Sequence, residues 1–403
     1  ATRMPMTRRT LLKAAPGAVL ACAWQAAAAT AAALSRSSDV LDLSAIDLAA
    51  AIRTRSVSAR EVMQAYLARL SALNPRFNAI VSPVAPERLL QQAAAQDADA
   101  AKGRFHGALH GFPHAVKDTA PVKDILSTQG SPLLRDNVPT ADSLVVSRMR
   151  DAGAIFTGKT NVPEFALGSH SYNPLFGVTR NAYDPRTSAG GSSGGSAVAL
   201  ALRMTPLGDG SDFGGSLRNP AGWNNVFGFR PSFGRVPSAP STDVFGQTYA
   251  TSGPMARTVD DLALMLSVQA GADPRAPFSL KDDPAIFARP LARDWKGARI
   301  GWLGDLGGAL PMEDGVLACC EQALSAFRSI GASVDAARLD EPADAMWRTA
   351  VTLRHLSVGA DLRAFAADPS RRAQMKPEAL WEGDGFNAMT AAASRGGQAG
   401  RTA

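Results

Sequence analysis

The chain has 403 residues, of which 46% are apolar and 19% charged, and this composition supports a large folded core and excludes a wholly disordered chain. The 36 glycines and 26 prolines are close to average usage, which excludes collagen-like and low-complexity classes. Of the formal charge of +6, residues 1–38 supply five basic and no acidic residues, so 37 basic and 36 acidic residues remain elsewhere. The bulk of the chain is nearly neutral, and nucleic acid is not an expected partner.

The first segment is typical of an export signal. A twin arginine, Arg8-Arg9, precedes an alanine-rich stretch that extends to about residue 33. Twin-arginine signals direct the export of folded bacterial proteins, and small residues suit a signal-peptidase site. We therefore expect a signal peptide over 1–34, a periplasmic or secreted protein, and a single domain over 39–403. Alanine partitions poorly into lipid, so no stable membrane anchor is expected. The alternative is an arginine-bearing tail.

Amphipathic segments with start and stop signals predict the helices. Ser44 begins the first, a capping box from Ser58 to Glu61 begins the second, and Asn74-Pro75 is expected to end that second helix. The helices are predicted over residues 43–53, 58–73, 87–101, 143–151, 259–269, 314–330 and 343–367.

Short apolar runs between these helices predict strands. From about residue 106 to 240 they alternate with glycine-rich turns, an alternation typical of α/β folds. The proline-rich segment 271–293 is expected to be a linker or a surface excursion. After this segment, a predicted strand, a helix and a second strand follow one another, and this order predicts a further βαβ-like unit. The strands are predicted at residues 115–116, 154–156, 298–303 and 332–334.

Two glycine-rich runs carry the candidate chemistry. They are Gly190–Ser196, with the sequence GGSSGGS, and Gly208–Ser216, with the sequence GDGSDFGGS. Glycine permits positive φ and brings backbone N–H groups close to a ligand, where adjacent N–H groups bind an anion. A serine beside them could attack a carbonyl while these groups hold the oxyanion. A phosphate loop would need a following lysine, and a dinucleotide loop the pattern GxGxxG; neither is present.

A serine nucleophile needs a base, and the residues alone leave two candidates. His170 lies near the glycine-rich runs, and Lys117 lies in a short apolar run. A desolvated lysine can be neutral and act as a base, so both remain open at this point.

Three histidines spaced four residues apart would align as metal ligands on a helix. They are His106, His110 and His114. Gly107 and Pro113 oppose a regular helix there, so no metal site is expected and the histidines are interpreted as loop or supporting residues.

The glycine-rich runs, together with Val116-Lys117-Asp118, resemble the amidase signature family. Lys117 stands 75 residues before Ser192, and Ser216 stands 24 residues after it. The resemblance covers about residues 41–340 and implies an α/β fold, an amidase-signature α/β/α sandwich with a mixed central sheet and helices on both faces. Further matching segments are Leu109–Gly111, Gly158–Asn161, Glu164-Phe165, Phe176–Asn181, Pro220-Ala221 and Gly234–Pro237.

The same resemblance implies a Ser–cis-Ser–Lys triad that uses no cofactor and no metal. Ser216 would be the nucleophile, Ser192 would follow a cis peptide bond and relay the proton, and Lys117 would be a general base that starts neutral. The oxyanion hole would consist of the backbone N–H groups of Phe213, Gly214, Gly215 and Ser216. The residues implied to support the catalytic groups from behind are Ser193, Asp212 and Arg218.

Three features depart from the family pattern. Phe213 stands where smaller residues are common and is expected to narrow the acyl pocket. The segment that leads into the Lys117 strand, Phe112-Pro113-His114, is less apolar than the corresponding segment of the family. Residues 395–403 read as the middle of a helix, so a truncated sequence is expected.

These observations predict an exported amidohydrolase that converts a carboxamide into a carboxylate and ammonia. Its expected partner is a small-molecule amide, and a homodimer stays open. One alternative is the amidotransferase component of a tRNA-dependent complex, which uses the same triad to supply ammonia to partner subunits. The export signal and the near-neutral charge argue against it. The other is a non-catalytic binding protein of the same fold.

Overall fold

The computed structural model describes residues 40–239 and 248–400, and the chain divides into two compact units. Unit 1 contains the described residues up to Pro290 together with Gln374–Glu378, and unit 2 contains Leu291–Ala373 and the described residues from Ala379 onward. The signal peptide predicted over 1–34 lies outside the described residues, and the single domain over 39–403 stays a prediction.

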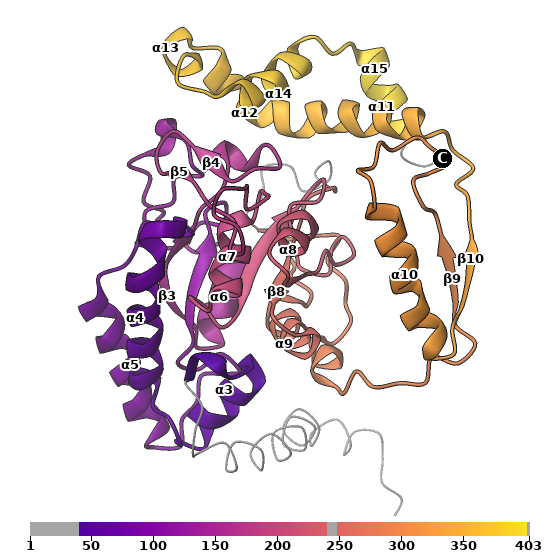
Figure 1. Cartoon of the computed structure of the whole chain (residues 1–403). Coiled ribbons are helices and arrows are strands. Elements are labelled where there is room, and N and C mark those ends of the chain that lie inside the picture. The colour runs from indigo at the N-terminus through magenta and orange to yellow at the C-terminus, as the bar shows by residue number, and fades with distance from the viewer. Residues whose placement is uncertain (1–39, 240–247, 401–403) are drawn as a thin grey trace, which may run out of the picture. The chain divides into compact units, whose positions relative to one another are not determined.

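Unit 1 is built on two three-stranded sheets (Figure 1). The first has the order β1-β3-β2 and is mixed, because β3 pairs antiparallel with β1 and parallel with β2. The second has the order β6-β8-β7 and is antiparallel, and β4 and β5 form an antiparallel pair. The strands are β1 (Ile80–Val81), β2 (Pro113–Lys117), β3 (Ile155–Thr160), β4 (Tyr172–Asn173), β5 (Gly177–Val178), β6 (Gly208–Asp212), β7 (Phe227–Gly228) and β8 (Thr251–Ala256).

The helices of unit 1 cover both faces of the first sheet. Ala115 of β2 belongs to a buried cluster with Val198 of α7, whereas the next residue, Val116, packs in a cluster with Val146 of α6 and Met265 of α9. Successive strand residues point to opposite faces, so this split places helices on both sides. The predicted α/β class is confirmed. The helices are α3 (Ala45–Arg53), α4 (Ala59–Phe77), α5 (Pro86–Ala100), α6 (Leu144–Asp151), α7 (Gly194–Ala201), α8 (Arg218–Trp223) and α9 (Val259–Gln269).

The central sheet is divided where β2 and β6 approach each other. These strands belong to separate hydrogen-bonded sheets, and the Lys117 N–H donates to the Asp209 carboxylate, 3.1 Å from Oδ1 and 3.3 Å from Oδ2. In a continuous sheet a backbone carbonyl would accept this bond. A side chain therefore connects the last residue of β2 to β6.

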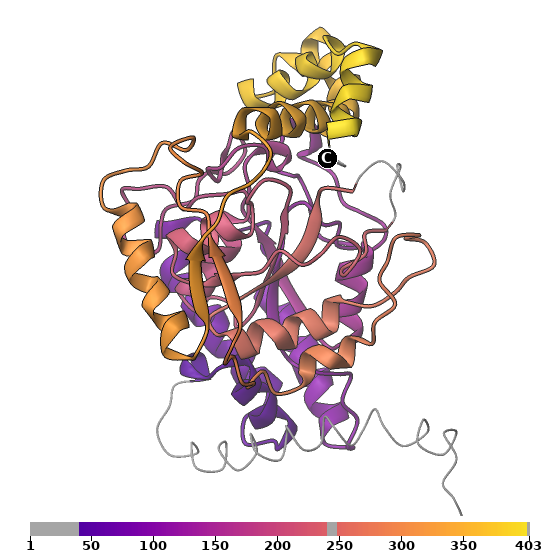
Figure 2. The same cartoon turned by 90° about the vertical axis from the view of Figure 1, so that its right-hand side faces the viewer.

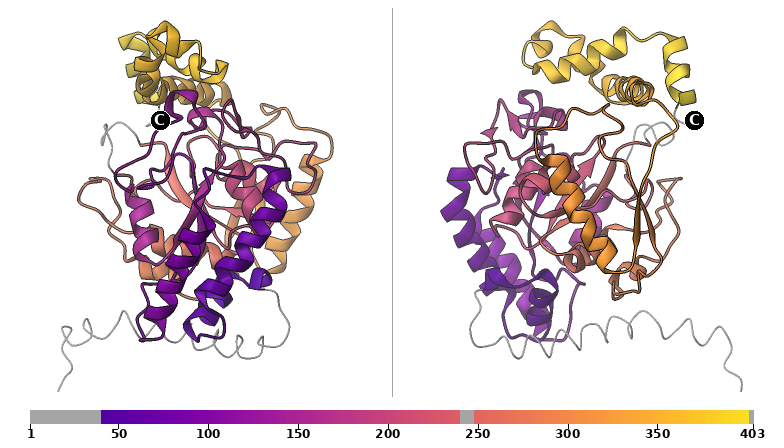
Figure 3. Two further views of the ribbon diagram at one scale, coloured as in Figure 1. Left: turned by 90° about the vertical axis from the view of Figure 1, so that its left-hand side faces the viewer. Right: turned by 45° about the vertical axis from the view of Figure 1, so that its right-hand side comes forward.

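The second helix, α4, continues beyond its predicted end. Its capping box is formed as predicted, with Glu61 N–H donating to Ser58 Oγ and Ser58 N–H donating to the Glu61 carboxylate. The prediction that Asn74-Pro75 ends it is wrong, because α4 extends to Phe77. Proline removes one backbone donor, but the helix continues to a left-handed cap at Asn78, whose N–H donates to the Asn74 carbonyl. In the left view of Figure 3, α4 and α5 lie side by side.

Unit 2 begins with the predicted βαβ unit. Strands β9 (Arg299–Trp302) and β10 (Ser333–Ala336) are parallel, and α10 (Val316–Ser329) connects them, as Figure 2 shows in orange. The predicted helical stretch 343–367 contains a π-helical turn, His355–Gly359. Within the two described ranges, no helix is both long and apolar enough to span a bilayer. The remaining helices are α11 (Ala343–Arg354), α12 (Ala360–Ala366), α13 (Pro369–Arg372), α14 (Pro377–Asn387) and α15 (Ala391–Gly400).

The segment Gln374–Glu378 returns to unit 1, where Lys376 anchors it. The Lys376 N–H donates to Glu164 Oε2 at 2.7 Å, and Lys376 Nζ donates to the Leu167 carbonyl at 2.7 Å. The Glu164 side chain is buried and also accepts a hydrogen bond from Ser131 Oγ at 2.7 Å. The segment therefore satisfies a buried carboxylate of unit 1.

Candidate active site

Lys117 ends β2 and is completely buried. Its Nζ lies 2.8 Å from Ser192 Oγ, 3.0 Å from Ser211 Oγ and 3.2 Å from the Ser211 carbonyl oxygen. Burial lowers the pKa of Lys117 from 10.5 to about 7, although the nearby carboxylates Asp209 and Asp212 act in the opposite direction. A lysine in this setting is neutral in a large share of molecules at neutral pH.

Ser192 lies in the first glycine-rich run, and its peptide bond with Gly191 is cis, as the resemblance implies. A Cβ at Gly191 would lie 3.0 Å from the His170 backbone nitrogen, so a larger residue does not fit there without movement. The next residue, Ser193, is buried, and its N–H donates to the Ser216 carbonyl at 3.1 Å. This bond ties the first run to the turn that contains the predicted nucleophile.

The turn after β6 holds the half-buried Ser216 and is braced by Asp212. The buried Asp212 carboxylate accepts the N–H groups of Gly215 at 2.8 Å and Leu217 at 3.1 Å, and both Nε and Nη2 of Arg218 at 3.0 Å. Burial raises the pKa of Asp212, but these hydrogen bonds outweigh it and leave that pKa below its ordinary value. Asp212 and Arg218 thus hold the turn from behind.

The predicted oxyanion donors differ in their surroundings. The Gly215 N–H donates to Asp212 in this structure, so it is already engaged. Gly214 is exposed, and a Cβ at this position would meet no atom within 4 Å, which leaves room for a ligand beside the turn. The Phe213 ring lies 5.6 Å from the Tyr249 ring. The N–H groups of Phe213, Gly214 and Ser216 stay predicted as oxyanion donors.

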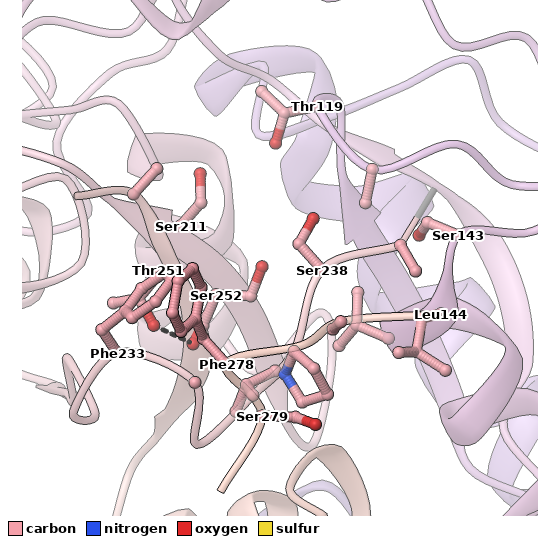
Figure 4. A pocket seen from close by; sticks show the side chains of 18 of the residues that line it. Thr119, Ser143, Leu144, Ser211, Phe233, Ser238, Thr251, Ser252, Phe278 and Ser279 are labelled. Carbon is pink, nitrogen blue, oxygen red and sulfur yellow. Dashed lines mark hydrogen bonds between the residues drawn. The ribbon is translucent and has the colours of Figure 1, made fainter. Parts of the chain in front are cut away.

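A cavity of about 430 Å³ lies in unit 1 and is lined by Ser211, the partner of Lys117 (Figure 4). Its described walls combine apolar side chains, with Phe233 and Phe278 among them, and hydroxyl side chains. The buried Ser143 hydroxyl has no hydrogen-bond partner among the described residues. The hydroxyl-bearing residues of the wall are Thr119, Ser143, Ser211, Ser238, Thr251, Ser252 and Ser279.

The histidines are placed apart from this constellation or behind it. The His170 ring is exposed. Its Nδ1 lies 2.7 Å from Ser188 Oγ, and its centroid lies 5.8 Å from that of the Trp223 ring. The His106 and His110 rings stack at 5.3 Å. His114 is buried and pairs with Asp209 at 3.0 Å. The structure thus brings Ser192 and Ser211, and not the His170 ring, against Lys117.

Sequence reasoning missed two contacts of this region. Ser211 was not predicted to bind Lys117, and His114 was not predicted to pair with Asp209. The spacing between Ser211 and Ser216 gave a signal for the first, since both lie in one glycine-rich run. The second joins residues 95 positions apart, and only the meeting of β2 with β6 brings them together.

Comparisons with known proteins identify the family of this chain. The family model described as Amidase matches residues 61–383. An acylamidase of Rhodococcus erythropolis is 38% identical over 310 residues, which are 76% of this chain and 64% of that protein. A glutamyl-tRNA(Gln) amidotransferase subunit of Acidothermus cellulolyticus is 40% identical over 298 residues, 74% of this chain and 58% of that protein.

Solved structures give the same result. A bacterial aryl acylamidase of the amidase signature family superposes with a TM-score of 0.83 at 29% identity, covering 89% of this chain and 75% of that one. A peptide amidase from Stenotrophomonas maltophilia gives a TM-score of 0.72 at 30% identity, covering 90% and 78%. The chain belongs to the amidase signature family. It spans 58–64% of the length of the two curated relatives.

Proposed function

We propose that this protein is an amidohydrolase that cleaves the C–N bond of a carboxamide through a serine acyl-enzyme. The observation that carries the proposal is the completely buried Lys117, whose Nζ lies 2.8 Å from Ser192 Oγ. A buried lysine with a pKa of about 7 is suited to accept a proton near neutral pH. The hydrogen bond from the Ser193 N–H to the Ser216 carbonyl, which ties the backbone of the predicted nucleophile to the residue after Ser192, also supports the proposal.

In the first half of the reaction, Ser216 Oγ attacks the carbonyl carbon of the amide. Its proton passes to Ser192 Oγ, whose own proton passes to the neutral Lys117 Nζ, so one ammonium forms as one C–O bond forms. The backbone N–H groups of Phe213, Gly214 and Ser216 hold the resulting oxyanion. Asp212 and Arg218 keep the turn in place during this step.

Collapse of the tetrahedral intermediate then breaks the C–N bond. The Lys117 ammonium returns its proton through Ser192 to the departing nitrogen, which leaves as ammonia or an amine. Water attacks the acyl-enzyme by the same proton path, and the carboxylic acid leaves as Ser216 regains its proton. The cycle restores neutral Lys117 and uses no cofactor.

The described part of the cavity wall is uncharged, which supports a neutral substrate. Its described residues are apolar or carry hydroxyl and amide groups, and none is acidic or basic. Glutamine, the ammonia donor expected for an amidotransferase, carries an ammonium and a carboxylate that would need charged partners when buried. This lining favours the hydrolase over the amidotransferase, although the chain is 40% identical to the Acidothermus amidotransferase protein.

An ammonia-release screen of the purified chain tests the proposal. Neutral aliphatic and aromatic primary amides are expected to be hydrolysed at least about tenfold more efficiently, in kcat/KM, than glutamine or asparagine. The Ser216→Ala variant serves as the blank. Preferential hydrolysis of glutamine, or stable co-purification with partner proteins, would support the amidotransferase instead. Absence of hydrolysis for every amide would leave a binding protein of this fold.

We also propose that the protein is exported by the twin-arginine route. Arg8 and Arg9, which lie outside the described residues, support this location. Replacing both by lysine in the bacterial host is expected to retain the protein in the cytoplasm with its signal uncleaved, as measured by fractionation and immunoblotting. An unchanged amount of periplasmic protein in this variant would contradict the proposal.

A further inference from the structure

A buried histidine–carboxylate pair lies directly behind the catalytic lysine. His114 and Asp209 are 1% and 3% exposed, and His114 Nε2 lies 3.0 Å from Asp209 Oδ1. An ionised carboxylate can only accept hydrogen bonds, so His114 Nε2 carries the proton and donates it. The same oxygen accepts the Lys117 N–H at 3.1 Å. One carboxylate thus links a buried imidazole to the backbone of the base.

This carboxylate has two opposing effects on Lys117. Its hydrogen bond fixes the backbone from which the catalytic side chain extends. Its negative charge stabilises the Lys117 ammonium, and this opposes the lowering of the lysine pKa by burial. A base that must start neutral therefore benefits when another donor shares the charge of Asp209.

We propose that His114 and Asp209 form a positioning pair for Lys117, in which Asp209 fixes the end of β2 and His114 limits how strongly this carboxylate holds the lysine in its protonated form. The inference rests on the proposed function, because it assigns the pair to the base of that reaction. Neither residue touches the substrate, so both are positioning residues.

The three variants leave the other charged groups around the lysine in place, although Asp209 also acts on the buried Lys159, whose pKa is lowered by burial to about 8. From β6, Asp212 acts on Lys117 but is neutralised by Arg218 and by Arg230, whose Nε lies 3.4 Å away. From β3, the buried Lys159 lies 4.0 Å from Asp118, the residue after Lys117. Helix α7, which also packs against β2, contributes no titratable side chain. Asp209 therefore is the carboxylate near Lys117 whose side-chain partner is a histidine.

Three variants separate charge control from simple packing. His114→Leu leaves the Asp209 carboxylate with the Lys117 N–H as its remaining donor. The carboxylate then stabilises the Lys117 ammonium more strongly, so the acid limb of the pH–rate profile moves up by about 0.5–1.5 pH units. Asp209→Asn keeps an acceptor for that N–H but removes the charge, so the limb moves down by a similar amount. His114→Gln retains a side-chain N–H donor and is expected to stay within about 0.3 units of the wild type.

Two rates are measured from pH 5 to 10 on the full chain: kcat/KM for a neutral aryl amide and the labelling of Ser216 by a fluorophosphonate. Labelling requires an activated serine but no amide hydrolysis. A wild-type protein that is labelled but does not hydrolyse amides would contradict the proposed function, and its labelling rates would still test the role of His114 and Asp209. His170→Gln is the matched control, because it removes an imidazole that contacts Ser188 and Trp223, and its profile is expected to match the wild type.

Opposite shifts for His114→Leu and Asp209→Asn would establish the pair. Lower rates with unchanged midpoints in both variants would overturn it and leave a packing role only. Thermal unfolding checks that each variant is folded. If His114→Leu does not fold, the comparison of Asp209→Asn with His114→Gln still decides, since a downward shift in the first and none in the second is required.

Discussion

Replacing Ser216 by alanine is expected to abolish amide hydrolysis, with a loss of roughly 10⁴–10⁶-fold in kcat. The acyl-enzyme cannot form without Ser216 Oγ, whereas the surrounding turn does not depend on this hydroxyl. Asp212 still accepts the N–H groups of Gly215 and Leu217, and Ser193 N–H still donates to the backbone carbonyl of residue 216. The variant should therefore fold normally, which thermal unfolding will check.

Mass spectrometry after reaction with a fluorophosphonate should locate the adduct on Ser216. Ser193→Ala is the matched control, because the Ser193 hydroxyl is buried and has no hydrogen-bond partner among the described residues. This variant keeps the backbone N–H that contacts Ser216, and it should retain far more activity. An adduct on Ser192 or Ser193 would reverse the assignment of the nucleophile.

Replacing Lys117 by alanine is expected to reduce acylation by about 10²–10⁴-fold, the usual effect of losing a general base. In the wild type, kcat/KM should rise with pH through about 7 and then level off, since burial lowers the pKa of Lys117 to about 7 and the neutral amine is the active form. The residual activity of the variant should lose this rise. Steady-state kinetics from pH 5 to 10 measure both effects.

One control variant distinguishes the lysine from a histidine base whose pH profile has a similar midpoint. His170→Ala should keep most of the activity and the same pH profile, because the His170 ring contacts Ser188 and Trp223. An inactive His170→Ala beside an active Lys117→Ala would replace the serine–lysine mechanism by a histidine-based one.

Lys117 also makes the stability depend on pH. Its pKa in the folded state lies below the value of about 10.4 in an unfolded chain, so the unfolded chain binds more protons between about pH 7 and 10. The free energy of unfolding therefore rises with pH over this range, and the cost of burying the lysine is greatest below it. Lys117→Met should remove the contribution of this lysine, leaving that of the buried Lys159, whose pKa is lowered to about 8, and should raise the melting temperature at pH 6.

Local signals predicted several helices around the site, but of the elements that carry the site itself they predicted β2 and not β6, α7 or α8. The capping residues Ser44 and Ser58 begin α3 and α4, and the helix expected over 259–269 has these bounds in the structure. The predicted end of α4 was too early. A proline in the sequence indicates that one backbone N–H donor is lost, but it does not indicate the tertiary contacts that keep the next turn helical.

The contact between Lys117 and Ser192 was predictable through the resemblance to the family, although the two residues stand 75 positions apart. The spacing of Lys117, Ser192 and Ser216 indicated the family, and the structure brings Lys117 and Ser192 into contact. The pairing of His114 with Asp209 was not predictable, because it depends on how β2 and β6 approach without a shared backbone ladder. The engagement of the Gly215 N–H by Asp212 depends likewise on the geometry of one turn.

The return of Gln374–Glu378 to unit 1 limits how the protein can be shortened for biochemical work. A fragment ending at Pro290 would look like an intact unit in the sequence, yet it would lack the Lys376 N–H that binds the buried Glu164. Loss of a partner by a buried carboxylate costs about 1–3 kcal/mol or more. Glu164 precedes Phe165, which lines the cavity of unit 1, so this loss would disturb the wall of that cavity. Expression of unit 1 alone therefore requires the distant pentapeptide, supplied in the same chain or by a designed linker.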